Sequence, residues 1–180
     1  MQRATGASHQ VWHRSPRTVA MSKRSDVRLG KDNERRLAKW YGWRKVGQFS
    51  DAVDLLGADI KVQSKATRHH IPAALADMTY GPGAVYRMDI APVYVTEPLG
   101  KMAGLYPDRI PVLVRSFIHR GRPTRDFVYL SARHWYALHG TFDEVNEGLC
   151  ETAKGYVVMT GVQWLDIHGR ETLNPPDRMA

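Results

Sequence analysis

The sequence predicts an α/β fold, because it contains a clear helical pattern followed by three strand patterns. Residues 32–41 are rich in helix-forming side chains and lie between two glycines, which is typical of a short helix. Residues 60–65 alternate apolar and polar side chains, and residues 111–118 and 126–130 are strand-like runs separated by a turn. A chain of 180 residues with 43% hydrophobic content can bury one core of this kind.

The first 20 residues mix Ser, Thr, Gly, Pro and Arg without apolar periodicity. We expect residues 1–20 to be disordered. Met21-Ser-Lys-Arg looks like a more natural start, so residues 1–20 would then derive from an upstream start codon.

The predicted helix over residues 32–41 is amphipathic. Leu37, Trp40 and Tyr41 fall on one face at helical spacing, so this face should pack on the sheet. Residues 43–48 then predict a first short strand.

Residues 53–65 predict a β-hairpin with polar side chains on one face. An apolar run is followed by Gly-Ala-Asp at residues 57–59, which favours a turn, and then by the alternating strand. Because strand side chains alternate, Gln63 and Lys65 point to the same face. An acidic residue on the neighbouring strand, Asp54 by preference, would lie close to both.

The carboxylate, amide oxygen and ammonium of this hairpin suggest metal-assisted hydrolysis. Carboxylate and carbonyl oxygens are hard ligands, which suit Mg²⁺. An ammonium beside a metal-bound water can stabilise hydroxide and the charge that develops on a phosphate under attack. The reaction class that this chemistry favours is phosphodiester hydrolysis.

Between the hairpin and residue 111 the sequence predicts one helix and a long irregular stretch. The Thr67 side chain can cap a helix N-terminus, and Pro72 lies near the first turn of a helix that runs to about residue 78. Gly-Pro-Gly at residues 81–83 interrupts the chain, and we expect residues 84–110, with their scattered prolines, to be irregular.

The C-terminal part contains a repeat. The block 127–140 recurs 29 residues later as 156–169, which predicts two strand-cap-helix units. In each unit a Trp should anchor the core and a His should end the helix before a Gly. The matching residues are Trp135 and Trp164, and His139 and His168.

Charge and cysteine content narrow the function classes. The net charge is +8, and residues 1–49 carry 12 Lys/Arg against 3 Asp/Glu, while the remainder carries 14 against 15. The excess positive charge favours a polyanionic partner such as a nucleic-acid backbone. The single Cys150 excludes an internal disulfide and a Cys-rich zinc site. No apolar run is long enough to cross a membrane and no secretory signal is visible, so we expect a cytoplasmic protein.

These motifs resemble the PD-(D/E)xK nuclease superfamily, and within it the phage and archaeal Holliday junction resolvase-like branch. The similarity is carried by an Asp followed at a distance by Gln-x-Lys on a hairpin, after a Gly-x-x-x-Glu helix start from Gly30 to Glu34. The strand-turn-strand-helix unit from Pro111 to Gly140 follows in the order that phage members show. The similarity covers about residues 22–140.

The resemblance implies a restriction-endonuclease-like three-layer core, in which a central mixed β-sheet is flanked by helices. Residues 21–140 would be the nuclease-like domain. Residues 141–172 would be a strand-helix extension packed on the same domain, and residues 173–180 a loose tail.

The resemblance also implies a set of site residues. Asp54, Gln63 and Lys65 would be catalytic, with Glu34 as an accessory carboxylate. Mg²⁺, for which Mn²⁺ can substitute, would be held by Asp54, Gln63 and Ser64. The residues expected to contact nucleic acid are Arg28, Lys31, Arg35, Arg36, Arg68 and His69.

The sequence departs from the family pattern in two places. Gln63 stands where the family places Asp or Glu, so the site has one negative charge fewer. The proline before the first acid is absent, which leaves Asp51 as an alternative to Asp54 and Asp59 as a third candidate. Glu34 also has a simpler interpretation, since a carboxylate stabilises a helix N-terminus.

Three functions follow as hypotheses. The first is a Mg²⁺-dependent endodeoxyribonuclease that cuts branched DNA as a homodimer in the cytoplasm of a bacterial or phage-infected cell. The second is a catalytically inactive nucleic-acid-binding protein that retains the nuclease fold. The third is a structural protein with a basic arm, which no motif supports.

Overall fold

The computed structural model describes residues 16–46, 52–72, 75, 93–139, 150–151 and 155–171. The described helices are α1 (Pro16–Tyr41), α3 (Val93–Met102), α4 (Ala132–His139) and α5 (Gly161–His168). The described strands are β1 (Arg44–Lys45), β2 (Leu55–Leu56), β3 (Ile60–Thr67), β4 (Ile110–Phe117), β5 (Arg125–Ser131), β6 (Cys150–Glu151) and β7 (Tyr156–Thr160).

The strands form one mixed sheet in the order β1-β2-β3-β4-β5-β7-β6. Strands β3 and β4 pair in parallel from Ile60 opposite Ile110 to Thr67 opposite Phe117, and the other neighbours pair antiparallel. A parallel pair needs a crossover connection, which residues 68–109 supply.

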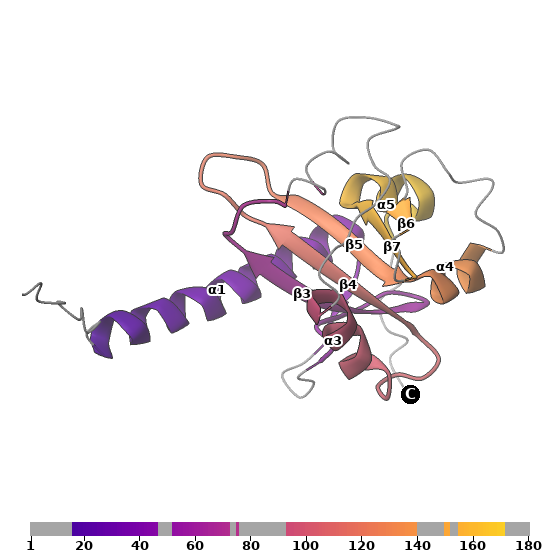
Figure 1. The fold of residues 1–180 in the computed structure, drawn as a ribbon, viewed down its shortest axis with the longest axis horizontal. Coiled ribbons are helices and arrows are strands. Elements are labelled where there is room, and N and C mark those ends of the chain that lie inside the picture. Colours follow the sequence, from indigo (N-terminus) through magenta and orange to yellow (C-terminus); the bar gives the residue numbers. More distant parts are fainter. Residues whose placement is uncertain are drawn as a thin grey trace, which may run out of the picture.

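Helices cover both faces of the sheet, so the described part has three layers (Figure 1). One core lies between the sheet and α1, α4 and α5, and includes Leu37, Trp135 and Trp164. The second core lies on the other face, where α3 contributes Val95, Leu99 and Met102. The prediction of an α/β fold with a mixed sheet flanked by helices is therefore confirmed.

Helix α1 is longer than predicted, because it begins at Pro16 and runs for 26 residues. Proline suits the first helical position. Gly30, which the sequence suggested as a helix boundary, lies inside α1. The expectation of disorder is thus wrong for residues 16–20, while residues 1–15 lie outside the described part.

A polar cluster fixes α1 on the sheet. The Arg36 guanidinium forms an ion pair with Asp126 of β5, with Nη2–Oδ1 at 2.6 Å and Nη1–Oδ2 at 2.9 Å. One turn earlier, Asn33 Nδ2 donates to Ser116 Oγ of β4 at 3.0 Å. The Tyr41 hydroxyl donates to Asp126 Oδ2 at 3.5 Å. A side chain predicted to contact nucleic acid, Arg36, therefore has a structural role.

The predicted repeat forms two strand-cap-helix units, β5-α4 and β7-α5, on neighbouring strands. Ser131 Oγ accepts from the backbone N–H of His134, and Thr160 with Gln163 forms a complete capping box. Trp135 and Trp164 are buried in the first core, as predicted.

The two histidines of the repeat lie against these tryptophans. The His168 ring stacks on Trp164 with centroids 4.0 Å apart, and the His139 ring lies 4.1 Å from Trp135. Burial, followed by the neighbouring His139, lowers the pKa of His168 to about 4. His168 is therefore neutral at physiological pH and belongs to the packing of the repeat.

The expectation that residues 84–110 are irregular is wrong for α3. Val95, Leu99 and Met102 fall on one face at helical spacing and bury against the sheet. The buried Lys61 of β3 holds the end of this helix, because its ammonium donates to the carbonyl oxygens of Ala103, Leu105 and Tyr106. A cation next to a helix C-terminus is favourable.

The remaining predicted elements agree in part with the strands and helices of the structure. The strands at 111–118 and 126–130 correspond to β4 and β5, and residues 141–172 contribute β7 to the same sheet. The predicted first strand is limited to β1 in the described residues. Most of the predicted helix after Pro72 lies outside them, as do residues 173–180. Across the described ranges, no helix has the length and apolar character that a membrane crossing requires.

Removing the Arg36 guanidinium should destabilise the fold, because it leaves the Asp126 carboxylate, 7% exposed, without its ionic partner. We expect Arg36→Ala to lower the free energy of unfolding by about 3 kcal/mol, measured by urea denaturation. Arg35→Ala is the matched control. It breaks an exposed pair with Asp32 and should cost at most about 1 kcal/mol. Equal losses in the two variants would show that the Arg36–Asp126 pair does not anchor α1.

Candidate active site

Hydrogen bonds place Asp54 against the middle of β3. Leu55 pairs with Val62 at the end of the antiparallel β2–β3 ladder, and Asp54 comes directly before it. The Asp54 N–H donates to Val62 O at 2.8 Å, and its Oδ2 accepts the Ser64 N–H at 2.6 Å, so Asp54 lies beside the part of β3 that contains Gln63. Along β3 itself side chains alternate, so Gln63 and Lys65 share one face.

The Asp54 carboxylate is held in place by the strand beside it. Its Oδ2 accepts the backbone N–H of Ser64 at 2.6 Å, a charge-assisted hydrogen bond. Burial raises the pKa of Asp54 above its ordinary value, and the nearby Glu34 carboxylate raises it further. The hydrogen bonds from Ser64 and the Lys65 ammonium act in the opposite direction. Asp54 is therefore a fixed, partly desolvated carboxylate that interacts with both the Glu34 carboxylate and the Lys65 ammonium.

Gln63 has a buried side chain with an unused acceptor. The residue is 3% exposed, and its Oε1 has no hydrogen-bond partner among the described residues. A buried carbonyl oxygen without a partner costs about 1–3 kcal/mol, so such groups are uncommon unless a ligand or water completes them. Gln63 Oε1 is therefore suited to a cation or a hydrogen-bond donor.

Glu34 reaches this site from α1. Its Oε2 lies 3.2 Å from Lys45 Nζ, in a partly exposed ion pair. Lys45 is the cross-strand partner of Leu55, whose side chain belongs to the α1 face of the sheet. Glu34 raises the pKa of Asp54, so the two carboxylates interact. Because α1 begins at Pro16, Glu34 is not at the start of a helix.

A second acid near Lys65, Glu97 of α3, was missed by the sequence analysis. Lys61 fixes the C-terminal end of α3 beside the start of β3, so the helix runs back along the strand. Lys65 then lies roughly 13 Å from Lys61 along β3. Glu97 lies roughly 9 Å before Ala103 along the axis of α3, in the same direction. The pKa of Glu97 is lowered by its hydrogen bond from Lys101 and, more weakly, by Lys65. The helical spacing of Val95, Leu99 and Met102 was the signal that could have revealed this helix.

The other candidates for the first acid are less favourable. Asp59 is exposed in the β2–β3 turn, and it raises the pKa of Glu171, next to which it lies. Asp51 lies outside the described residues. Ser64, a predicted metal ligand, directs its backbone N–H to Asp54 and so positions that carboxylate.

The predicted nucleic-acid contacts divide into paired and unpaired groups. Arg28 and Arg35 both pair with Asp32, at 3.7 and 2.8 Å. Arg68 lies 3.8 Å from Asp26. Lys31 and His69 are exposed.

The donors of this site suit a hard cation better than a soft one. Asp54 offers a carboxylate and Gln63 an unpartnered amide oxygen, which are ligands that Mg²⁺ and Mn²⁺ accept. Three or more His, Cys, Asp or Glu side chains do not gather anywhere in the described ranges. A Mg²⁺ ion here would therefore retain several of its waters.

Comparisons with protein-family models, with curated proteins and with solved structures give no match for this chain.

The electrostatics of the site can be tested by titration. We expect the Asp54 carboxyl carbon, followed by NMR, to titrate above the ordinary value of 3.8. Lys65→Ala should raise this pKa, because it removes a cation that favours the charged carboxylate, and Glu34→Gln should lower it. Arg133→Ala, on α4, should leave it unchanged. Identical titrations in all four proteins would show that Glu34 and Lys65 do not act on Asp54.

Proposed function

We propose that this chain is a metal-dependent endonuclease that hydrolyses phosphodiester bonds in branched or otherwise structured DNA. The observation that carries the proposal is that the Asp54 carboxylate is held against β3 by the Ser64 N–H, beside the buried Gln63, whose Oε1 has no partner among the described residues, and near Lys65. The order of helix, strand and hairpin also supports the restriction-endonuclease-like core that the resemblance implies.

Each residue would have a distinct part in the hydrolysis. Asp54 and Gln63 would hold Mg²⁺, which would polarise the phosphate and lower the pKa of a bound water. The Lys65 ammonium would orient this water and stabilise negative charge on the phosphate oxygens as the P–O bond breaks. Glu34 would increase the negative potential at Asp54. The overall reaction adds one water and leaves a phosphate monoester and a hydroxyl.

The fixed geometry of Asp54 favours catalysis over loose cation binding. Its Oδ2 is held by the Ser64 N–H, which leaves Oδ1 as the second acceptor of the carboxylate. A ligand already oriented in the free protein loses less conformational entropy when the metal binds. The branched substrate, and a homodimer that would cut two strands symmetrically, follow from the resemblance alone.

A second candidate function is nucleic-acid binding without chemistry. Gln63 supplies no negative charge, and Glu34 is partly neutralised by Lys45 at 3.2 Å. Both features lower the affinity for a cation that we expect of this site. A nuclease-like site that has lost catalysis would have the same features.

Cleavage assays distinguish these two functions. Purified protein should cut a labelled four-way junction in Mg²⁺ and in Mn²⁺, and chelator should abolish the cutting. We expect Lys65→Ala and Asp54→Ala to reduce the rate by about 10²-fold or more, because each removes a group that acts on the reacting phosphate.

The control for this experiment is binding of the same DNA in chelator. It should survive in Lys65→Ala, whose side chain is exposed and has no structural partner among the described residues. Cleavage that persists undiminished in both variants would place the chemistry elsewhere. Tight binding by the folded wild-type protein without cleavage of junction, flap, nicked or linear DNA would establish the second function.

Restoring the missing charge tests the metal site directly. We expect Gln63→Glu to lower the melting temperature without metal, because it buries a second carboxylate beside Asp54. Mg²⁺ should bind the variant roughly tenfold more tightly than the wild type and should reverse this loss. Calorimetric melting with and without Mg²⁺ measures both effects. Adding Asp54→Ala should abolish the gain, and a gain that survives it would exclude the proposed pair of ligands.

A further inference from the structure

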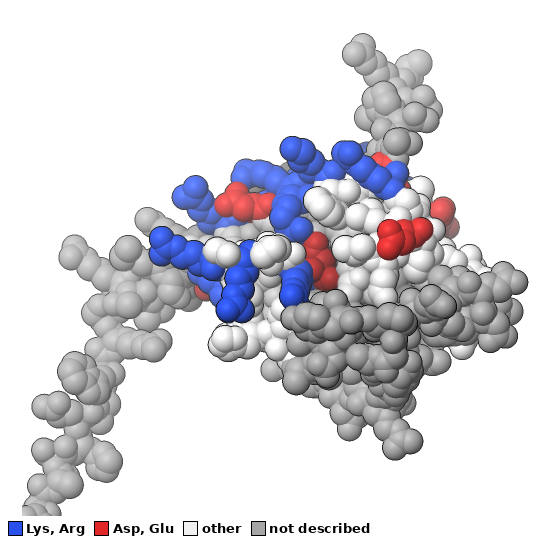
Figure 2. All heavy atoms as spheres, turned by 90° about the horizontal axis from the view of Figure 1, so that it is seen from above, with Lys and Arg blue, Asp and Glu red and all other residues white. Residues whose placement is uncertain are grey.

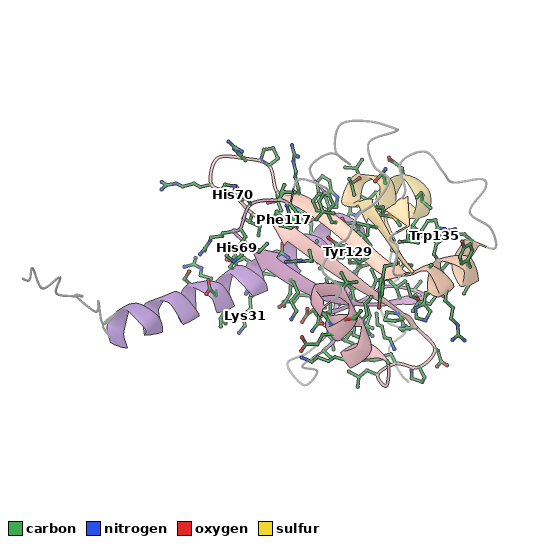
Figure 3. All side chains as sticks on the ribbon, viewed as in Figure 1. Lys31, His69, His70, Phe117, Tyr129 and Trp135 are labelled. Carbon is green, nitrogen blue, oxygen red and sulfur yellow. The ribbon has the colours of Figure 1, made fainter. Side chains whose placement is uncertain are left out.

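Three segments that are distant in the sequence lie together at the end of the sheet where β3 and β4 finish. The Ile118 N–H donates to Thr67 O at 2.8 Å, which continues the parallel ladder past both strands. Beyond it, the His70 ring stacks on His119, with centroids 6.0 Å apart. Arg68 Nη1 donates to Ser25 Oγ of α1 at 3.2 Å. Figure 3 shows His69 and His70 at this end and Trp135 at the opposite end, near α4.

The β4–β5 connection supplies positive charge that the sequence analysis did not assign. We define the basic turn as residues 119–122, His-Arg-Gly-Arg. Gly121 has a φ of 73°, which permits the tight reversal, and the Arg122 N–H donates to His119 O at 3.3 Å. The reversal leaves Arg120 and Arg122 exposed.

The basic turn differs from the arginines of α1 in how its charge is compensated. Arg28 and Arg35 share Asp32, and Arg36 is bound to Asp126, whereas Lys31 and Lys39 of the same helix are exposed and form no ion pair among the described residues. Arg68 is near Asp26. By contrast, neither Arg120 nor Arg122 contacts a carboxylate within the described residues. Lys and Arg side chains are grouped on part of the face in Figure 2, with a few acidic side chains among them.

We propose that the basic turn, together with Arg68 and His70, is the main contact of this protein with the phosphate backbone of duplex DNA. Uncompensated cations release the most counterions when they meet phosphates, so they contribute most to affinity. The proposal therefore moves the binding surface from α1, where the sequence concentrates its positive charge, to the end of β3 and β4.

The position of this surface relative to Lys65 fits a substrate that crosses both. Arg68 directly follows the end of β3 and lies three residues beyond Lys65, which is roughly 10 Å for extended chain. That distance corresponds to about three nucleotides along one strand of a duplex. A backbone held at the basic turn would then extend past the proposed active site, so this part of the proposal rests on the proposed function.

The surface favours a duplex over a single strand. Proteins that bind single strands stack unpaired bases on aromatic side chains. The large exposed aromatic side chains of the described residues are Trp40, Tyr106 and Tyr136. None of them lies in residues 25–35, 68–72 or 119–122. The aromatic rings at this surface belong to histidines, of which His70 and His119 stack on each other. Contacts from arginine side chains suit the regular phosphate spacing of a duplex.

Fluorescence anisotropy with a labelled duplex, in chelator and over a range of salt, tests the proposal apart from catalysis. We expect the double variant Arg120→Ala/Arg122→Ala to bind roughly tenfold more weakly and to reduce the slope of log K against log salt by about 2. The matched variant Arg28→Ala/Arg35→Ala should reduce the slope by less than half of the reduction that the Arg120→Ala/Arg122→Ala variant shows. Arg133→Ala, exposed on α4, should bind like the wild type.

The outcomes separate this proposal from the proposed function. Weaker duplex binding by the turn variant supports the surface, whether or not the protein cleaves DNA. Absence of duplex binding by the wild type at low salt would overturn it. An α1 variant that loses more than the turn variant would do the same, as would a wild type that prefers the single strand of the same sequence. Thermal melting of each variant confirms that the exposed substitutions leave the fold intact.

Discussion

The Arg36–Asp126 ion pair sets the position of α1, and the geometry of the candidate site depends on it. Asn33 and Arg36 are one turn apart, and both bond to neighbouring strands, so the helix cannot rotate about its axis without breaking both contacts. Glu34 follows Asn33 by one residue, or roughly 100° around the helix. The same two bonds that anchor the helix therefore direct Glu34 toward the sheet edge where Lys45 and Asp54 lie.

This arrangement places partly buried charge next to an apolar core. The hydrogen bonds from Arg36 and Tyr41 satisfy the Asp126 carboxylate. Asp54 accepts hydrogen bonds from Ser64, and Gln63 Oε1 has no partner among the described residues. Buried polar groups that are fully paired support a fold, whereas an unpartnered group is open to a ligand or water. Buried nitrogens of His139 and His168 also lack partners among the described residues, so the feature specific to the candidate site is an unpartnered amide oxygen beside a carboxylate.

Much of the fold was predictable, because its patterns are local. The alternation in residues 60–65 and the repeat marked by Trp135 and Trp164 predicted strands and caps that the structure contains. The sequence analysis missed helix α3, because Pro98 and Gly100 favour a loop. In the folded chain, burial of one apolar face of the helix outweighs this preference. The roles of Arg36 and Lys61 depend on partners 90 and more than 40 residues away, which periodicity does not reveal. For the site, the alternation of the predicted strand placed Gln63 and Lys65 on one face. The position of Asp54 against Val62 and Ser64, and the approach of Glu97, depend on how the chain folds.

The parallel pairing of β3 with β4 has a consequence for how the molecule assembles. The β2–β3 and β4–β5 pairs join segments that are close in sequence, so little chain entropy is lost when they form. The β3–β4 pair must close the long loop of residues 68–109, and non-local pairing of this kind slows folding. The β2–β3 hairpin and the basic turn thus lie on two hairpins that can form independently. They become neighbours only when β3 pairs with β4, so a chain in which this pairing has not formed would have both halves of the surface and no means of using them together.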